Sequence, residues 1–171
     1  MAQEVGAGLG QCEILFRPLP QGQGGHALKL DFWQCTQDPI PKVVALIARR
    51  ALGQGERVLV VAADPMQRAA ISRALWEGGA ESFLAHGEAD APGADRQPIL
   101  LSSEPQPLNA ASHLILADGT FRDVPGFARV FLLFPPDLAP QARAAWRAVD
   151  GREGVERSYF AQENGRWEKK A

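Results

Sequence analysis

The fold class is decided by the apolar run Arg57-Val58-Leu59-Val60-Val61-Ala62, which continues into Ala63-Asp64-Pro65-Met66. Consecutive apolar residues without polar interruptions are typical of a strand that is covered on both faces of a sheet. Aspartate followed by proline is a common start of a helix, with the aspartate as N-cap and the proline in the first turn. We therefore predict a buried strand that leads into a helix ending near Trp76, the repeating unit of an α/β protein.

Upstream of this unit, the chain predicts another strand and another helix. Residues Leu28–Cys35 alternate weakly between apolar and polar side chains, which suits a strand. Asp38-Pro39 repeats the helix-start signal, and Gly53 and Gly55 end the predicted helix. Between these signals, apolar residues recur at helical spacing: Ile40, Val43, Val44, Ile47 and Ala51.

The first 27 residues differ from the rest of the chain. Residues 1–27 are rich in glycine, glutamine and proline and hold few core-forming side chains, so we expect a poorly ordered N-terminal extension. Gly6, Gly8 and Gly10 have the spacing of a nucleotide-binding loop. Neither a strand before them nor a helix after them is indicated, so we do not expect such a loop.

Downstream of Trp76 the alternation of strands and helices continues. Strands are predicted at residues 82–85, 99–101, 112–117, 130–134 and 159–161, with loops at residues 86–98 and 102–111 and a tail at Arg166-Trp167. A third helix is predicted after Pro135-Pro136-Asp137 and ends near Val149. The pattern predicts a single α/β domain over residues 28–171, a sandwich around a mostly parallel central sheet.

The composition excludes several classes of protein. The 171 residues carry a net charge of −2, which argues against binding of duplex DNA by bulk electrostatics. No apolar run approaches the roughly 20 residues that span a bilayer, and we expect neither a membrane segment nor a secretory signal. Cys12 and Cys35 form no CxxC motif, so we expect no disulfide framework or zinc site, and a reducing cytoplasm fits.

We expect no catalytic centre, metal or cofactor. The turn after residues 57–62 has no glycines and no Gly-Lys-Ser/Thr, and the chain has no Gly-x-Ser-x-Gly elbow. The histidines His26, His86 and His113 lack a metal-binding partner at helical spacing. Asp118-Gly119 follows a predicted strand, where α/β enzymes place catalytic acids, but the pair is equally typical of a turn.

An alternative is a small nucleotide-dependent enzyme or regulator that binds its ligand at the carboxyl ends of the strands. This function requires an anion site at the start of a helix. Asp38 and Asp64 occupy the two best positions, and their charges would repel a phosphate.

The third predicted helix carries a possible binding face. Helical periodicity places Leu138, Ala142, Ala145 and Val149 on the core side. Arg143, Trp146 and Arg147 fall on the other side. An aromatic ring between two guanidinium groups suits an acidic peptide, or a single-stranded base with its phosphates. A half-buried tryptophan beside two solvated arginines is an equally common arrangement.

A second pair of aromatic residues flanks the turn at Gly78-Gly79. Trp76 stands at the end of a predicted helix, and Phe83 stands in the next predicted strand. Either residue alone is typical of a core position. Together, at the edge of the domain, they also suit an anchor for a partner helix.

Several segments, taken in order, resemble a known family: Leu75-Trp76, Glu81–Gly87, Asp95–Leu101, Asn109 to Asp118-Gly119, Val130–Phe134, Ala142–Trp146 and Gln162–Lys170. With them the chain resembles the chi subunit family of bacterial DNA polymerase III over about Leu28–Ala171. Asn109-Ala110 stands where the family has an Asn-Gly turn. The resemblance implies a Rossmann-like fold without a phosphate-binding loop, in a cytoplasmic accessory subunit that needs no cofactor and has no catalysis of its own.

The resemblance also implies two protein partners. The acidic tail of single-stranded DNA-binding protein (SSB), which ends in Pro-Phe, would bind the third helix through Arg143, Trp146 and Arg147. Phe134 would line the apolar pocket for that tail. The psi subunit, or an equivalent clamp-loader protein, would dock at Trp76 and Phe83.

Overall fold

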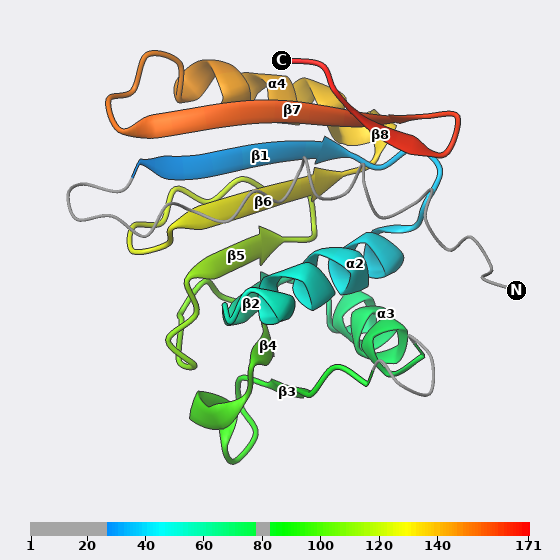
Figure 1. Ribbon diagram of the computed structural model, residues 1–171, viewed down its shortest axis with the longest axis vertical. Coiled ribbons are helices and arrows are strands. Elements are labelled where there is room, and N and C mark those ends of the chain that lie inside the picture. The colour runs from blue at the N-terminus through cyan, green and yellow to red at the C-terminus, as the bar shows by residue number, and fades with distance from the viewer. Residues whose placement is uncertain (1–26, 78–82) are drawn as a thin grey trace, which may run out of the picture.

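A computed structural model describes residues 27–77 and 83–171. In these residues, eight strands form a single sheet in the order β3-β4-β2-β5-β6-β1-β7-β8 (Figure 1). All neighbouring strands are parallel except β7 and β8, which are antiparallel. The strands are β1 (Leu28–Gln34), β2 (Val58–Val61), β3 (His86–Glu88), β4 (Ile99–Ser102), β5 (His113–Leu116), β6 (Arg129–Phe134), β7 (Val155–Glu163) and β8 (Arg166–Lys169).

Helices cover both faces of the sheet. The helices are α2 (Ile40–Gly53), α3 (Pro65–Trp76) and α4 (Ala139–Ala148), with single 3₁₀ turns at Ala94–Arg96 and Pro136–Leu138. α2 and α3 pack on one face, and α4 packs on the other (Figure 1). This layered arrangement confirms the predicted α/β sandwich with a mostly parallel sheet and a Rossmann-like fold.

Successive strand residues feed two separate cores because their side chains alternate between the faces. In β1, Trp33 points into the core under α2 and α3, whereas Phe32 points into the core under α4. In β2, Val60 and Leu59 divide in the same way, and all four residues of this strand are buried. The apolar run in residues 57–62 therefore is a central strand, as predicted.

The helix starts agree with the sequence at Asp64 and differ at Asp38. The Asp64 carboxylate accepts a hydrogen bond of 2.8 Å from the Met66 amide, as an N-cap does. α2 instead begins at Ile40 with Pro39 as its N-cap. Pro41 has no N–H, so it lacks the donor that a cap at Asp38 would use at the third helical position.

A strand was predicted at residues 82–85. Residues 83–85 form no strand in the structure, so the prediction is wrong for them, and Ser82 lies outside the described residues. The strand is β3, which begins at His86 and pairs with β4, so the predicted loop at residues 86–98 is also shorter. Phe83 and Leu84 gave a strand-like apolar signal, yet Leu84 is buried in the core and Phe83 lies on the surface. β3 is a three-residue edge strand of half-buried residues, which leaves no periodic apolar pattern.

The C-terminal segment forms more structure than expected. β7 spans nine residues instead of three, and the predicted tail is β8. Asn164 and Gly165 join the two strands with φ values of 51° and 76°, the left-handed conformations that a two-residue hairpin turn requires. The other predicted strands and the third helix agree with the structure to within a few residues.

One expectation remains at the level of the sequence. The extension predicted at residues 1–27 lies outside the described residues apart from Ala27. Across the described ranges, none of the helices combines the length and apolar character needed to cross a membrane.

Candidate functional site

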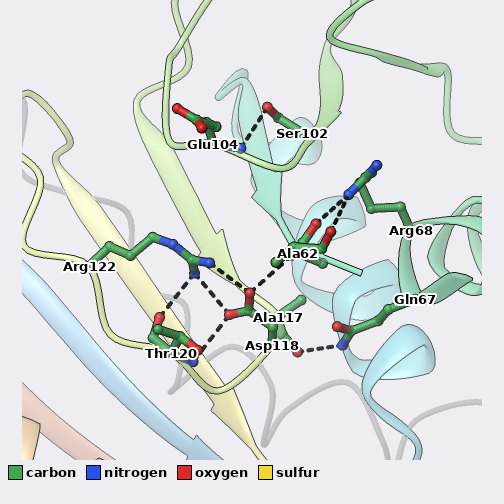
Figure 2. Close-up of polar contacts among 10 residues, drawn as sticks. Ala62, Gln67, Arg68, Ser102, Glu104, Ala117, Asp118, Thr120 and Arg122 are labelled. Carbon is green, nitrogen blue, oxygen red and sulfur yellow. Dashed lines mark hydrogen bonds and ion pairs between the residues drawn. The ribbon is translucent and has the colours of Figure 1, made fainter. Parts of the chain in front are cut away.

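The carboxyl ends of β2 and β5 meet where α/β proteins commonly bind nucleotides. Asp118 follows β5, and its carboxylate accepts hydrogen bonds of 3.1 Å from the amides of both Ala63 and Thr120 (Figure 2). Arg122 donates to both oxygens of the same carboxylate, at 2.9 and 2.8 Å. Arg68 donates to the carbonyls of Ala62 and Ala63 (Figure 2). The polar groups at this end of the sheet are therefore paired with one another.

Asp118 is held as a carboxylate by these contacts. Burial alone would raise its pKa, but the hydrogen bonds from Arg122 and from the two amides outweigh burial and hold the pKa below its usual value. The amide of Ala63, in the turn where a phosphate would bind, already donates to this side chain. Asp118 is thus a structural anion in this turn.

The two described histidines have structural partners. His86 lies between the Ser72 hydroxyl, 2.8 Å from Nε2, and the Leu84 carbonyl, 2.7 Å from Nδ1. His113 is buried, and burial lowers its pKa to about 4. Burial raises the pKa of the Cys35 thiol to about 12. In residues 27–77 and 83–171, no three His, Cys, Asp or Glu side chains are grouped as metal ligands.

The outer side of α4 carries two of the three residues predicted for it. Arg143 and Arg147 are exposed and lie one helical turn apart, whereas Trp146 is half-buried and packs against the core. The Trp146 ring makes edge contacts with Phe32 of β1 and Tyr159 of β7, at 5.2 and 6.2 Å between ring centroids. Within the described part of the chain, no acidic side chain forms an ion pair with either arginine. In the described residues, α4 therefore presents two guanidinium groups without an ion pair, one helical turn apart, on the helix that carries Trp146.

Strand β7 adds two residues that the sequence analysis did not identify. The Arg157 guanidinium lies 4.2 Å from the centroid of the Trp146 ring, and Tyr159 donates a hydrogen bond of 2.7 Å to Gln34 Oε1. Burial raises the pKa of the Tyr159 hydroxyl, and the nearby charge of Arg143 partly opposes that rise. The spacing of Arg157 and Tyr159 puts both on the α4 side of the sheet. We call Arg143, Trp146, Arg147, Arg157 and Tyr159 the α4 surface.

Phe134 lies beneath this surface and not on it. Its side chain is fully buried at the end of β6, and its ring makes an edge contact with Tyr159 at 5.9 Å. Phe134 therefore supports Tyr159 from below. A ligand on the α4 surface would meet Tyr159 before it met Phe134.

Trp76 and Phe83 form a second exposed feature, at the end of α3, which packs on the sheet face opposite to α4 (Figure 1). Their rings lie 4.6 Å apart between centroids, and 62% of Trp76 and 55% of Phe83 are accessible to solvent. The His86 ring stands at 5.8 Å from the Trp76 ring in an edge contact. The structure thus brings the two predicted residues together as an exposed aromatic pair.

Fold and surfaces together define a single-domain α/β protein of Rossmann-like architecture. Its nucleotide-binding position is closed by its own side chains, and it presents two separate aromatic surfaces. The model of the DNA polymerase III chi subunit family (HolC) matches residues 28–156. The chain belongs to this family and is an accessory subunit of DNA polymerase III. No curated protein matches it.

Proposed function

We propose that this accessory subunit links the clamp loader to SSB by capturing the acidic C-terminal tail of that protein on the α4 surface. The observation that carries the proposal is the placement of Arg143 and Arg147, exposed and without an ion pair in the described residues, on the helix that carries Trp146. Such a surface matches a short peptide that carries both carboxylates and an apolar side chain.

Each part of the tail has a counterpart on the α4 surface. A guanidinium binds a carboxylate through two parallel N–H···O hydrogen bonds, which fixes both position and orientation. The apolar end of the tail would pack against Trp146 and Tyr159, whose rings are held in place by Phe32 and Phe134. Because the rings are already ordered, binding costs little additional side-chain entropy.

The second partner belongs at the exposed aromatic pair. We propose that the psi subunit, or an equivalent clamp-loader protein, docks on Trp76 and Phe83. Two large exposed aromatic side chains in contact supply the kind of anchor that dominates protein interfaces. The two surfaces lie on opposite faces of the sheet, so one partner leaves the other surface free.

We propose that the protein acts in the cytoplasm, where the replication machinery operates. Catalysis is not part of the proposed role.

The alternative, a nucleotide-dependent enzyme or regulator, has less support. In the turn after β2, where a phosphate would bind, the Ala63 amide already donates a hydrogen bond to the Asp118 carboxylate. A carboxylate in that position repels an incoming phosphate.

Calorimetric titration with a peptide of the cognate SSB tail tests the proposal. We expect micromolar binding to the full tail and loss of that binding when the terminal phenylalanine is absent, because the apolar contact is then missing. A parallel titration with single-stranded DNA separates peptide capture from nucleic-acid binding, which would show a steep dependence on salt. If the protein binds neither peptide, the α4 surface has another role.

A further inference from the structure

Arg157, in the N-terminal half of β7, lies at an open sheet edge beside the α4 surface, while the Val155 amide at the start of the strand donates to the Arg152 carbonyl. β8 pairs with β7 at residues 160–163, and the backbone of Lys170 and Ala171 bonds to Tyr159. β7 residues alternate in the direction of their backbone groups, so the N–H and C=O of Arg157 point to the same side as those of Tyr159. In the described chain, no backbone group bonds to Arg157 on this side.

The side chain of Arg157 faces the α4 surface from this open edge. Its guanidinium covers the Trp146 ring and donates hydrogen bonds to the Trp146 carbonyl and to the carboxylate of Asp150. Arg157 therefore adds a third positive group to the α4 surface, and its guanidinium lies over the Trp146 ring. It differs from them because a carboxylate of this chain already binds it.

Asp150 is a weakly held ligand of Arg157. Its side chain is 66% exposed, compared with 22% for Arg157. An ion pair with one exposed partner contributes little to stability, since water solvates the carboxylate almost as well as the guanidinium does. An incoming carboxylate can replace it without leaving the Arg157 charge unpaired, so the exchange avoids the cost of a buried, uncompensated ion.

We propose that an acidic peptide binds in extended form along residues 155–158 of β7. It pairs with the free N–H and C=O of Arg157, and one of its carboxylates takes the place of Asp150 on the guanidinium. The inference rests on the proposed function. It adds the backbone conformation of the bound tail, and it adds Asp150 as a carboxylate of this chain that competes with the tail for Arg157. Strand addition at an open edge supplies affinity through main-chain hydrogen bonds and specificity through alternate side chains.

The charges around this edge favour an acidic occupant. Arg143, Arg147 and Arg157 lie on the α4 side, and Glu156 belongs to the alternate set of β7 residues that points to the opposite face. Asp150 is the carboxylate that pairs with Arg157. Removal of its charge leaves the guanidinium available to a ligand.

Two variants with opposite expected effects test the inference by calorimetry with the SSB tail peptide. Asp150→Asn removes the internal competitor, and we expect the peptide to bind about threefold more tightly. Arg157→Gln removes the third guanidinium, and we expect binding to weaken at least about tenfold. Asp123→Asn is the matched control for the first variant, since Asp123 pairs with Arg152 in another exposed ion pair.

Amide hydrogen exchange of Arg157 supplies an independent measurement that requires no substitution. We expect saturating peptide to slow this exchange, because the N–H then donates to the added strand. The inference is overturned if the wild-type protein binds the peptide but Asp150→Asn leaves its affinity unchanged and exchange at Arg157 does not slow. That result would leave capture on the α4 surface intact. Absence of any peptide binding by the wild-type protein would instead overturn both proposals.

Discussion

Arg129 of β6 and Asp31 of the neighbouring strand β1 form a buried ion pair. The Nη2–Oδ2 distance is 2.6 Å, and each side chain is 5% exposed. A second hydrogen bond of 2.7 Å runs from Arg129 Nε to the same oxygen. Two charges taken out of water in this way hold each other in place, and removal of Asp31 takes away a buried carboxylate that binds two nitrogens of the Arg129 guanidinium.

Asp31→Ala should therefore destabilise the domain strongly. We expect the free energy of unfolding to fall by about 3–5 kcal/mol, the usual cost of breaking a buried ion pair from one side. Urea unfolding followed by circular dichroism measures this change. Lys42→Ala is the matched control, because it breaks an exposed pair with Asp38 and should cost less than about 1 kcal/mol. An equal fall in the free energy of unfolding in the two variants would show that the buried pair stabilises the domain no more than the exposed pair does.

His113 should make the domain less stable in mild acid. Burial lowers its pKa to about 4 in the folded state, below the 6.5 of an unfolded chain. The unfolded state therefore takes up a proton first, so the stabilisation is complete above pH 6.5 and is lost as the pH falls toward 4. The loss amounts to about 3 kcal/mol. Unfolding of His113→Gln over this pH range should show a flatter profile than the wild type, and an unchanged slope would contradict the assignment.

Arg143→Ala should weaken capture of the SSB tail while the fold stays intact. Arg143 is exposed, so its removal leaves no buried cavity, but a hydrogen-bonded charge pair with the peptide is lost. We expect binding to weaken by about 1.5–3 kcal/mol in calorimetry. Arg73→Ala provides the control, since Arg73 is an exposed arginine of α3 on the opposite side of the sheet. If Arg143→Ala binds the peptide with the wild-type affinity, the peptide does not bind at this part of α4.

Trp76→Ser and Phe83→Ser should separate the two partners. The rings are 62% and 55% exposed, so their loss should change the stability of the isolated subunit only slightly. We expect each variant to lose association with the clamp loader in co-purification and to keep the wild-type affinity for the SSB tail. Loss of both interactions at once would indicate a folding defect or a shared surface.

The strongest parts of the fold were predictable because their signals are local. The apolar run at residues 57–62 and the cap at Asp64 gave a buried strand and a helix start that the structure contains. At Asp38 one local signal overrides another, because Pro41 has no N–H for a cap at Asp38, and the side chain of Asp38 also has a distant partner. Its carboxylate accepts hydrogen bonds from Lys42 and from Gln162, which is 124 positions away. A contact of that range cannot be read from the neighbouring sequence.

The candidate site was predictable only in part for the same reason. Helical periodicity placed Arg143, Trp146 and Arg147 on the outer side of α4; both arginines are exposed there, but Trp146 is half-buried against the core. Arg157 and Tyr159 share one face of β7 by simple alternation, a signal that the sequence contains. Their contacts with Trp146 depend on β7 lying next to β1 beneath α4, which is a property of the sheet order.

The position of β1 between β6 and β7 also governs when the domain is able to form during synthesis. In the described chain, β1 pairs with β6 and β7, and Lys29 lies opposite Arg129, which is made 100 residues later. A ribosome adds roughly 5–20 residues per second, so β1 is without its partner strand β6 for about 5–20 seconds after it is made. During that interval Phe32 and Trp33, both fully buried in the finished domain, have no sheet to cover them. The nascent subunit thus carries an apolar segment suited to binding by chaperones until its last third has been translated.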